Sequence, residues 1–119
     1  MIAVPDDARP ALDVLKSVGG DEMVAMLMRT FLQFAEERVA KLVEEAGHGN
    51  WDEAASIAHA LKSSARQLGA NALSDACADT ETAGRSGNDA GAKAGVEAIQ
   101  REFDLARGWM GALATPATS

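Results

Sequence analysis

The sequence has little of what disulfide-stabilised, β-rich or membrane-spanning proteins need. It contains one cysteine, so no disulfide can form within the chain, which is compatible with the reducing cytoplasm where we expect the protein to act. Tyrosine is absent and aromatic residues make up 4% of the chain, a composition that favours helices over sheets. No apolar run reaches the roughly 18 residues that a membrane-spanning helix needs.

Basic residues are also the minority. The 11 lysine and arginine residues stand against 18 aspartate and glutamate residues, which gives a net charge of −7. An acidic surface repels phosphate backbones and anionic lipid headgroups, so we expect no nucleic-acid partner and no membrane partner. With 119 residues, 47% of them hydrophobic, the chain can bury one modest core, and the sequence predicts one compact, monomeric domain.

The most informative stretch runs from Asn50 to Ala70 and predicts one helix with a recognisable start and end. Asn50 is a good N-cap, and Glu53 can bond back to the backbone N–H of the cap, as in a capping box. Gly69 can adopt the left-handed conformation that closes a helix. Between these ends, apolar residues recur every three or four positions and predict one core-facing stripe: Trp51, Ala54, Ala58, Leu61, Ala65 and Leu68.

His59 lies just beside this stripe, where we expect it near water. Its neighbours on the same helix face are Lys62, Ser63 and Arg66. Two cations and a hydroxyl around an imidazole suit an anion, and a phosphoryl group is the obvious candidate. Metal binding is disfavoured, because no Cys, His, Asp or Glu lies three or four positions after His59. An ordinary surface histidine is the alternative interpretation.

The residues around His59 also resemble a known family. The run His59-Ala60-Leu61-Lys62-Ser63-Ser64, followed by Leu68-Gly69-Ala70, resembles the signature of histidine-containing phosphotransfer (HPt) domains, which is His-x-Leu-Lys-Gly-Ser and then Leu-Gly-Ala. Val18-Gly19-Gly20-Asp21 and Asn50-Trp51 are similar to the family too, so the resemblance covers nearly the whole chain. Ser63 departs from the pattern, because the family usually has glycine there. Its side chain either crowds an approaching partner or donates a hydrogen bond to a phosphoryl group.

The resemblance implies a phosphocarrier in a multistep His–Asp phosphorelay, as in bacterial signalling. His59 would accept a phosphoryl group from an aspartate of one receiver domain and pass it to another. The implied partners are response-regulator receiver domains and an upstream hybrid histidine kinase. The chain has no Gly-rich phosphate loop and no acidic metal cluster, so we expect a carrier that is not an enzyme and has no cofactor, with Mg²⁺ on the partner receiver.

Further site residues are expected on the neighbouring helices. Antiparallel packing can bring Glu81 near His59, where a carboxylate would fix the tautomer of the ring, and the family often has Gln or Glu at this place. A solvated surface acid is the alternative for Glu81. Arg85, one turn later, is a further candidate for contact with the phosphoryl group or the partner. For receiver docking we expect apolar positions around His59: Ala55, Ala60, Val18, Met23 and Leu27.

The remaining sequence predicts the other helices of one bundle. Residues 1–8 are expected to be a flexible lead-in and residues 114–119 a disordered tail. Apolar residues at helical spacing predict four more helices, over about residues 9–17, 21–46, 71–83 and 90–113. Long amphipathic helices with short connections predict an all-α fold for residues 9–113, an antiparallel up-and-down four-helix bundle with an additional short N-terminal helix.

Two other classes of protein remain open. The first is a helical adaptor that keeps the HPt fold and binds signalling partners without carrying phosphate, with Ser63 as the obstacle to transfer. The second is an enzyme or metal protein that uses His59 together with Glu81. It predicts stoichiometric metal binding that is lost in His59→Ala.

Overall fold

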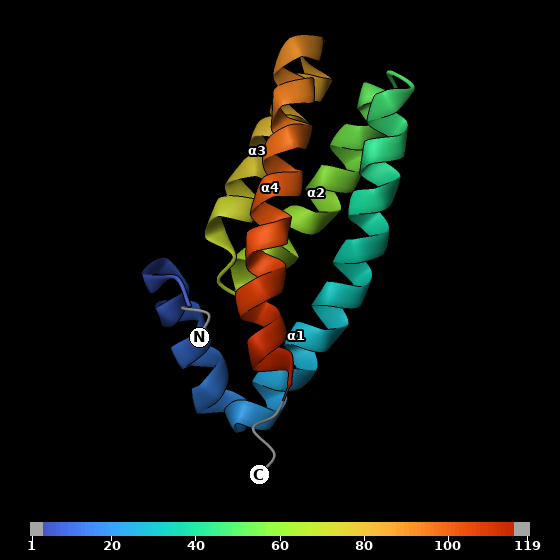
Figure 1. Ribbon diagram of the computed structural model, residues 1–119. Coiled ribbons are helices and arrows are strands. Elements are labelled where there is room, and N and C mark those ends of the chain that lie inside the picture. The colour runs from blue at the N-terminus through green and yellow to red at the C-terminus, as the bar shows by residue number, and fades with distance from the viewer. Residues whose placement is uncertain (1–3, 116–119) are drawn as a thin grey trace.

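The computed structural model describes residues 4–115, which form helices joined by short turns (Figure 1). A 3₁₀ turn precedes four α-helices: Asp6–Ala8, then α1 (Arg9–Gly47), α2 (Trp51–Gln67), α3 (Asn71–Arg85) and α4 (Asp89–Ala114). No strand occurs in this part of the chain. The predicted all-α fold is confirmed.

The four helices form an antiparallel up-and-down bundle. Each helix packs against the next one along the chain, and α1 also packs against α4, which closes the bundle around one core. Figure 1 shows the chain rising along the later part of α1, descending along α2, rising along α3 and descending along α4. The largest fully buried side chains come from all four helices: Met28, Leu42, Leu61, Leu73, Ile99 and Met110. The predicted bundle is confirmed.

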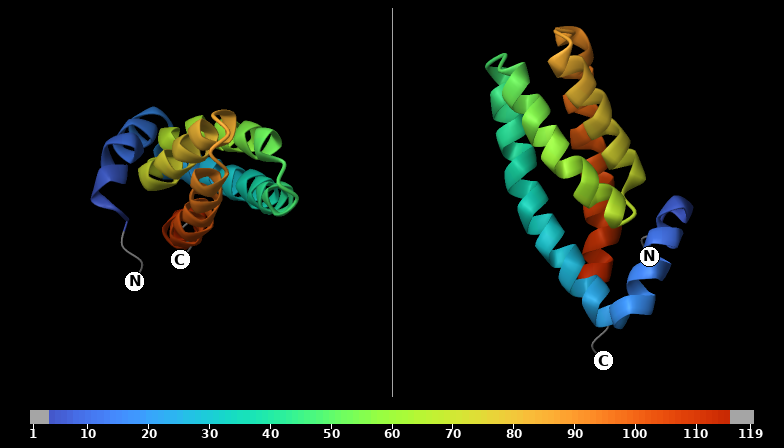
Figure 2. Two further views of the ribbon diagram at one scale, coloured as in Figure 1. Left: turned by 90° about the horizontal axis from the view of Figure 1, so that it is seen from above. Right: turned by 180° about the vertical axis from the view of Figure 1, so that it is seen from behind.

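A sharp bend at Gly20 divides α1 into a short and a long part. Gly20 has a φ of 73° and a ψ of −170°, a conformation that residues with a side chain rarely adopt. The part before the bend folds back beside one end of the bundle (Figure 2). The two helices predicted on either side of Gly19-Gly20 are therefore confirmed, and they meet directly at this kink within α1.

The start of the described chain packs against the connection between α2 and α3. Ala8 is fully buried, and a Cβ on Gly69 would lie 2.9 Å from the Cα and Cβ of Ala8. The side-chain amide of Asn71 donates a hydrogen bond to the carbonyl of Asp7 over 2.9 Å. The predicted flexible lead-in, residues 1–8, thus forms defined contacts at Asp7 and Ala8, and its residues 1–3 lie outside the described part.

The predicted tail also begins with a packed residue. Ala114 is buried and is the last residue of α4, and its carbonyl accepts a hydrogen bond of 2.8 Å from Nη1 of Arg29 on α1. The last helix therefore extends one residue beyond its predicted end. Residues 116–119 of the predicted tail lie outside the described part.

Small residues hold α3 close to both of its neighbours. A Cβ on Gly84 would lie 2.9 Å from the carbonyl oxygen of Trp51 and 3.1 Å from Cβ of Ala55, both on α2. A Cβ on Gly95 of α4 would overlap the hydroxyl of Thr80 on α3. Real Cβ atoms do not tolerate such contacts, so α3 can lie this close only because glycine stands at both positions. This spacing places polar side chains of α3 within reach of α2.

Candidate functional site

Helix α2 carries His59, and its start differs from the expectation. Asn50 precedes the helix, but its side chain does not cap it; Nδ2 donates instead to Oε2 of Glu45 over 2.8 Å. The predicted capping box between Asn50 and Glu53 is therefore wrong. The carboxylate of Glu45, at the end of α1, competes for the same side chain, and a charge-assisted bond is the stronger one. This bond is the main cause that lowers the pKa of Glu45.

The end of α2 confirms the sequence prediction. Gly69 has a φ of 88°, the left-handed conformation expected of it. The N–H of Ala70 bonds to the carbonyl of Ala65 over 2.8 Å, and the N–H of Gly69 to that of Arg66 over 3.1 Å. These two bonds form a Schellman motif, which satisfies the last carbonyls of the helix. The chain then turns directly into α3.

The predicted apolar stripe of α2 faces the core at every position but its first. The buried members are Ala54, Ala58, Leu61, Ala65 and Leu68. Trp51, in the first turn of the helix, is only half-buried because it lies at the end of the bundle. The stripe therefore fixes the rotation of α2, with His59 beside the buried face and exposed.

Glu81 on α3 contacts the ring of His59. Nδ1 of His59 lies 2.8 Å from Oε2 of Glu81, although the two residues are 22 positions apart in sequence. The side chain of His59 is 61% exposed, whereas that of Glu81 is 15% exposed. The carboxylate therefore holds one ring nitrogen from the protein side. Nε2 is the nitrogen that remains available to an incoming group.

Glu81 also binds two cations. Nζ of Lys62 donates to Oε1 over 2.7 Å, and Nε of Arg85 lies 3.2 Å from Oε2. The hydrogen bond from Lys62 is the largest cause that lowers the pKa of Glu81, and the bond with His59 lowers it further, although partial burial acts in the opposite direction. An ionised carboxylate can only accept hydrogen bonds. The proton of a neutral His59 ring therefore lies on Nδ1, and the lone pair lies on Nε2.

Arg66 does not join this cluster. Its Nη2 pairs with Oδ1 of Asp75 at 2.5 Å, and its Nε donates to the hydroxyl of Ser74 over 3.2 Å. Because α2 and α3 are antiparallel, a residue two turns after His59 meets α3 about two turns before Glu81. The structure therefore places Arg66 in a separate link between α2 and α3, where the sequence suggested a neighbour of the phosphoryl group.

The other side of α2 borders a groove with α1. Leu27, Thr30, Phe31 and Phe34 of α1 and Ser64, Gln67 and Leu68 at the end of α2 line a volume of about 300 Å³. Of the expected docking residues, Leu27 lines this groove and Ala60 is exposed. Sequence reasoning missed Thr30 and Gln67, because no pattern within one helix shows which residues meet across two helices.

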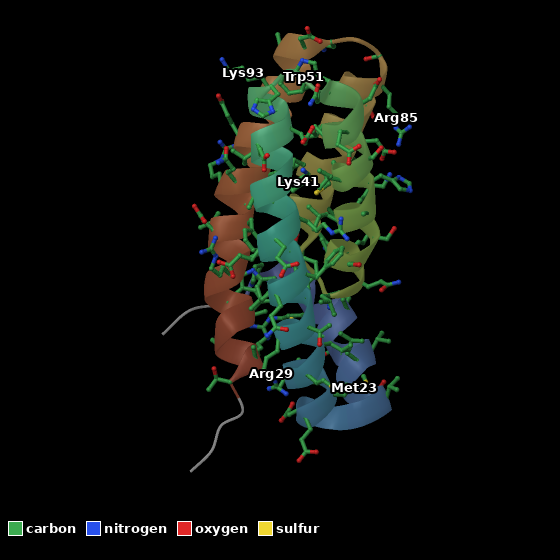
Figure 3. The ribbon with its side chains drawn as sticks, turned by 90° about the vertical axis from the view of Figure 1, so that its right-hand side faces the viewer. Met23, Arg29, Lys41, Trp51, Arg85 and Lys93 are labelled. Carbon is green, nitrogen blue, oxygen red and sulfur yellow. The ribbon has the colours of Figure 1, made fainter. Side chains whose placement is uncertain are left out.

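The remaining docking residues have different surroundings. Ala55 is fully buried against Gly84, so the prediction that it contributes to the docking surface is wrong; close packing of α2 on α3 covers it. Val18 is 74% exposed and Met23 is half-buried. Figure 3 shows Met23 at the bend of α1 and Arg85 toward the opposite end of the molecule. Met23 therefore lies at a distance from the cluster around Glu81.

The described residues give little support to a metal site, a reactive thiol or a membrane span. Within residues 4–115, no three His, Cys, Asp or Glu side chains gather as metal ligands would. Burial raises the pKa of Cys77 to about 12, so the residue is an unreactive thiol at neutral pH. None of the helices in the same range combines the length and the apolarity of a membrane span.

The structure is a four-helix bundle that presents an exposed histidine, held by a carboxylate with two cations beside it. A model of the Hpt domain family matches residues 26–109, and the chain belongs to this family. The predicted resemblance is confirmed. Hpt domains carry phosphoryl groups in two-component signalling relays.

A solved structure supports the same fold. A histidine-containing phosphotransfer protein from rice superimposes on the chain with a TM-score of 0.73 at 15% identity, over 93% of this chain and 79% of the rice chain. At this low identity the likeness shows a shared fold. No curated protein sequence matches the chain.

Proposed function

We propose that this protein carries a phosphoryl group on Nε2 of His59 between receiver domains of a multistep His–Asp phosphorelay. The observation that carries the proposal is the 2.8 Å contact between Nδ1 of His59 and Glu81. Because Glu81 is ionised, this contact fixes the proton on Nδ1 and leaves the lone pair of Nε2 free to attack. The nucleophile is thus oriented before a partner arrives.

In the accepting step, the lone pair of Nε2 attacks the phosphorus of an aspartyl phosphate on the receiver. The N–P bond forms while the P–O bond to the aspartate breaks, and the electron pair of that bond returns to the receiver carboxylate. The ring becomes a phosphorylated imidazolium that keeps its proton on Nδ1. Glu81 stabilises this positive charge through the same hydrogen bond, and the reverse sequence donates the phosphoryl group to a second receiver.

Lys62 and Arg85 are suited to hold the phosphoryl oxygens. Glu81 accepts one hydrogen bond from Lys62 and forms an ion pair with Nε of Arg85, while an ammonium has three donors and a guanidinium five. The remaining donors can bind the phosphoryl oxygens without loss of the contacts with Glu81. We therefore assign both residues to the charge balance of the phosphohistidine. Arg66 contributes by linking α2 to α3.

The receiver domain is expected to supply the metal ion and the catalytic groups for the transfer. The Hpt family match and the site in residues 4–115 support a carrier without kinase activity of its own, so the receiver would provide Mg²⁺ and the catalytic groups around its aspartate. We assign receiver docking to the groove between α1 and α2, which Leu27 and Thr30 line, together with the exposed Ala60 on α2. An upstream hybrid histidine kinase would feed the relay, and a cytoplasmic monomer is the form that fits this role.

The direct test is transfer of radioactive phosphate from phosphorylated receiver domains of the source organism to wild type and to His59→Gln. We expect acid-labile, base-stable label on wild type and none on the variant. Label on both proteins would exclude His59 as the acceptor. A folded wild type that binds a receiver but takes no label from any receiver would support the alternative, an adaptor that does not carry phosphate. In that case the exposed Ser63 would be the obstacle to transfer.

A further inference from the structure

Two serines flank His59 on the side of α2 that faces away from Glu81. Ser56 precedes His59 by one turn and Ser63 follows it by one turn, and both are exposed. At about 100° per residue, they lie roughly 60° and 40° around the helix from His59, whereas Lys62 lies about 60° away in the opposite direction. Lys62 contacts α3. The exposed face that carries His59 therefore has a cation on one side and two hydroxyls on the other.

Within residues 4–115, the hydroxyls of Ser56 and Ser63 have no hydrogen-bond partner. Hydroxyl side chains in helices often bond back to a carbonyl of their own helix, as Ser17, Thr80 and Thr115 do here. Among the contacts of residues 4–115, neither Ser56 nor Ser63 forms such a bond or any other side-chain hydrogen bond. Each of them retains an O–H donor for a group that arrives from solvent.

The direction of helical side chains brings these donors toward the ring. Side chains lean toward the N-terminus of their helix, so Ser63 leans over the turn that carries His59, and His59 leans toward the turn that carries Ser56. Glu81 holds Nδ1 on the α3 side. Nε2 is the ring nitrogen that Glu81 does not contact, and the two hydroxyls lie on the side of His59 that faces away from Lys62.

We propose that Ser56 and Ser63 donate hydrogen bonds to the phosphoryl group on Nε2 of His59 and thereby prolong the lifetime of the phosphohistidine. The inference rests on the proposed function, because it requires His59 to carry phosphate. Lys62 and Arg85 would hold the phosphoryl oxygens from the α3 side, and the two serines from the other. Ser63, where the family pattern has glycine, thus adds a donor that favours retention of the phosphoryl group over rapid release.

The test uses phosphoramidate, a small phosphoryl donor, so that the result does not depend on a receiver. Wild type, Ser56→Ala, Ser63→Ala, the double variant and Ser63→Thr are phosphorylated, and the decay of the phosphohistidine signal is followed by ³¹P NMR at neutral pH. We expect each alanine to shorten the half-life by about two- to tenfold, the factor that one net hydrogen bond is worth, and the double variant to shorten it most. Ser63→Thr keeps the hydroxyl and should restore the wild-type half-life.

Controls separate this inference from the proposed function. Ser17→Ala removes an exposed hydroxyl on α1 and should leave the half-life unchanged. Peptide mapping of the phosphorylated protein shows whether His59 carries the label, with His59→Gln as the blank. Phosphohistidine at position 59 with equal half-lives in wild type and both alanine variants would overturn the serine inference alone. A folded wild type without label at His59 would overturn the proposed function, and the serine inference with it.

Discussion

The two flanks of α2 are built differently. Toward α3, charged side chains pair across the interface, and Glu81 alone contacts His59, Lys62 and Arg85. Toward α1, the helix borders a groove lined mostly by apolar side chains. The α3 flank therefore orients the ring of His59 in advance, whereas the α1 flank leaves a surface that a partner can cover.

Residue size explains the difference. Ala55 and Gly84 bring α2 and α3 close enough for side chains of ordinary length to form ion pairs. On the α1 side, Leu27, Phe31 and Phe34 line a groove of about 300 Å³ together with Ser64, Gln67 and Leu68 at the end of α2. Close backbones thus favour a fixed polar network, and a wider gap between large apolar side chains produces a groove.

The largest effect is expected from removing the carboxylate on the α3 flank. Glu81→Ala frees Nδ1 of His59, so the ring can adopt the wrong tautomer and the imidazolium loses its counter-charge. We expect the rate of phosphoryl transfer from a receiver to fall by roughly 10- to 100-fold, by analogy with the loss of groups that orient metal-ligating histidines. Asp79→Ala removes an exposed acid from the same helix and is the control. Equal rates for Glu81→Ala and wild type would show that the ring needs no fixed tautomer.

A large side chain between α2 and α3 should destabilise the packing of these two helices. In Gly84→Leu, the new atoms meet the carbonyl of Trp51 and Cβ of Ala55, so we expect a loss of about 1–3 kcal/mol in the free energy of unfolding, measured with urea. Gly111→Ala is the control, because a Cβ there meets no atom within 4 Å. It should be neutral or stabilise the helix by up to about 1 kcal/mol. A Gly84→Leu variant as stable as wild type would contradict the tight interface.

A negative charge at the groove between α1 and α2 should weaken receiver binding without changing the site around His59. Thr30→Glu places a carboxylate at the exposed edge of the groove, so we expect the affinity for the receiver to fall by about three- to tenfold, as measured by titration calorimetry. Phosphorylation by phosphoramidate should be unchanged, because the α3 flank stays intact. Gln100→Glu, on α4, adds the same charge elsewhere and is the control. Receiver affinity unaffected by Thr30→Glu would place docking outside this groove.

The smallest effect is expected from low pH, which protonates Glu81 and reduces its contribution to the free energy of unfolding. The folded pKa of Glu81 is lower than its ordinary value of 4.5, mainly because of Lys62. The stability that this pairing contributes is fully present above the unfolded pKa and is lost as the pH falls through the lower folded pKa. Unfolding free energies of wild type and Glu81→Gln, measured from pH 7 downward, should therefore converge below about pH 4.5. A constant difference between the two proteins at every pH would show that the charge of Glu81 does not contribute.

Much of the fold could be predicted because its signals are local. The apolar stripe of α2, the closing conformation of Gly69 and the break at Gly20 all depend on spacing or on the conformational freedom of glycine. The contact between Glu81 and His59 was one of two interpretations that the sequence left open, the other being a solvated surface acid, and the structure shows the contact. Predictions failed where a more distant residue competed. Asn50 bonds to Glu45 instead of capping α2, and Arg66 pairs with Asp75.

Local residue patterns are enough to place each helix along the chain, to identify its apolar face and to put His59 beside that face. These properties depend on residues three or four positions apart, which are neighbours in any helix. Helix packing settles which side of α2 meets α3, that Ala55 is covered, and that Glu81 binds Lys62 as well as His59. The physical reason is that contacts across helices depend on the distance and register of two packed backbones, which small residues such as Gly84 set.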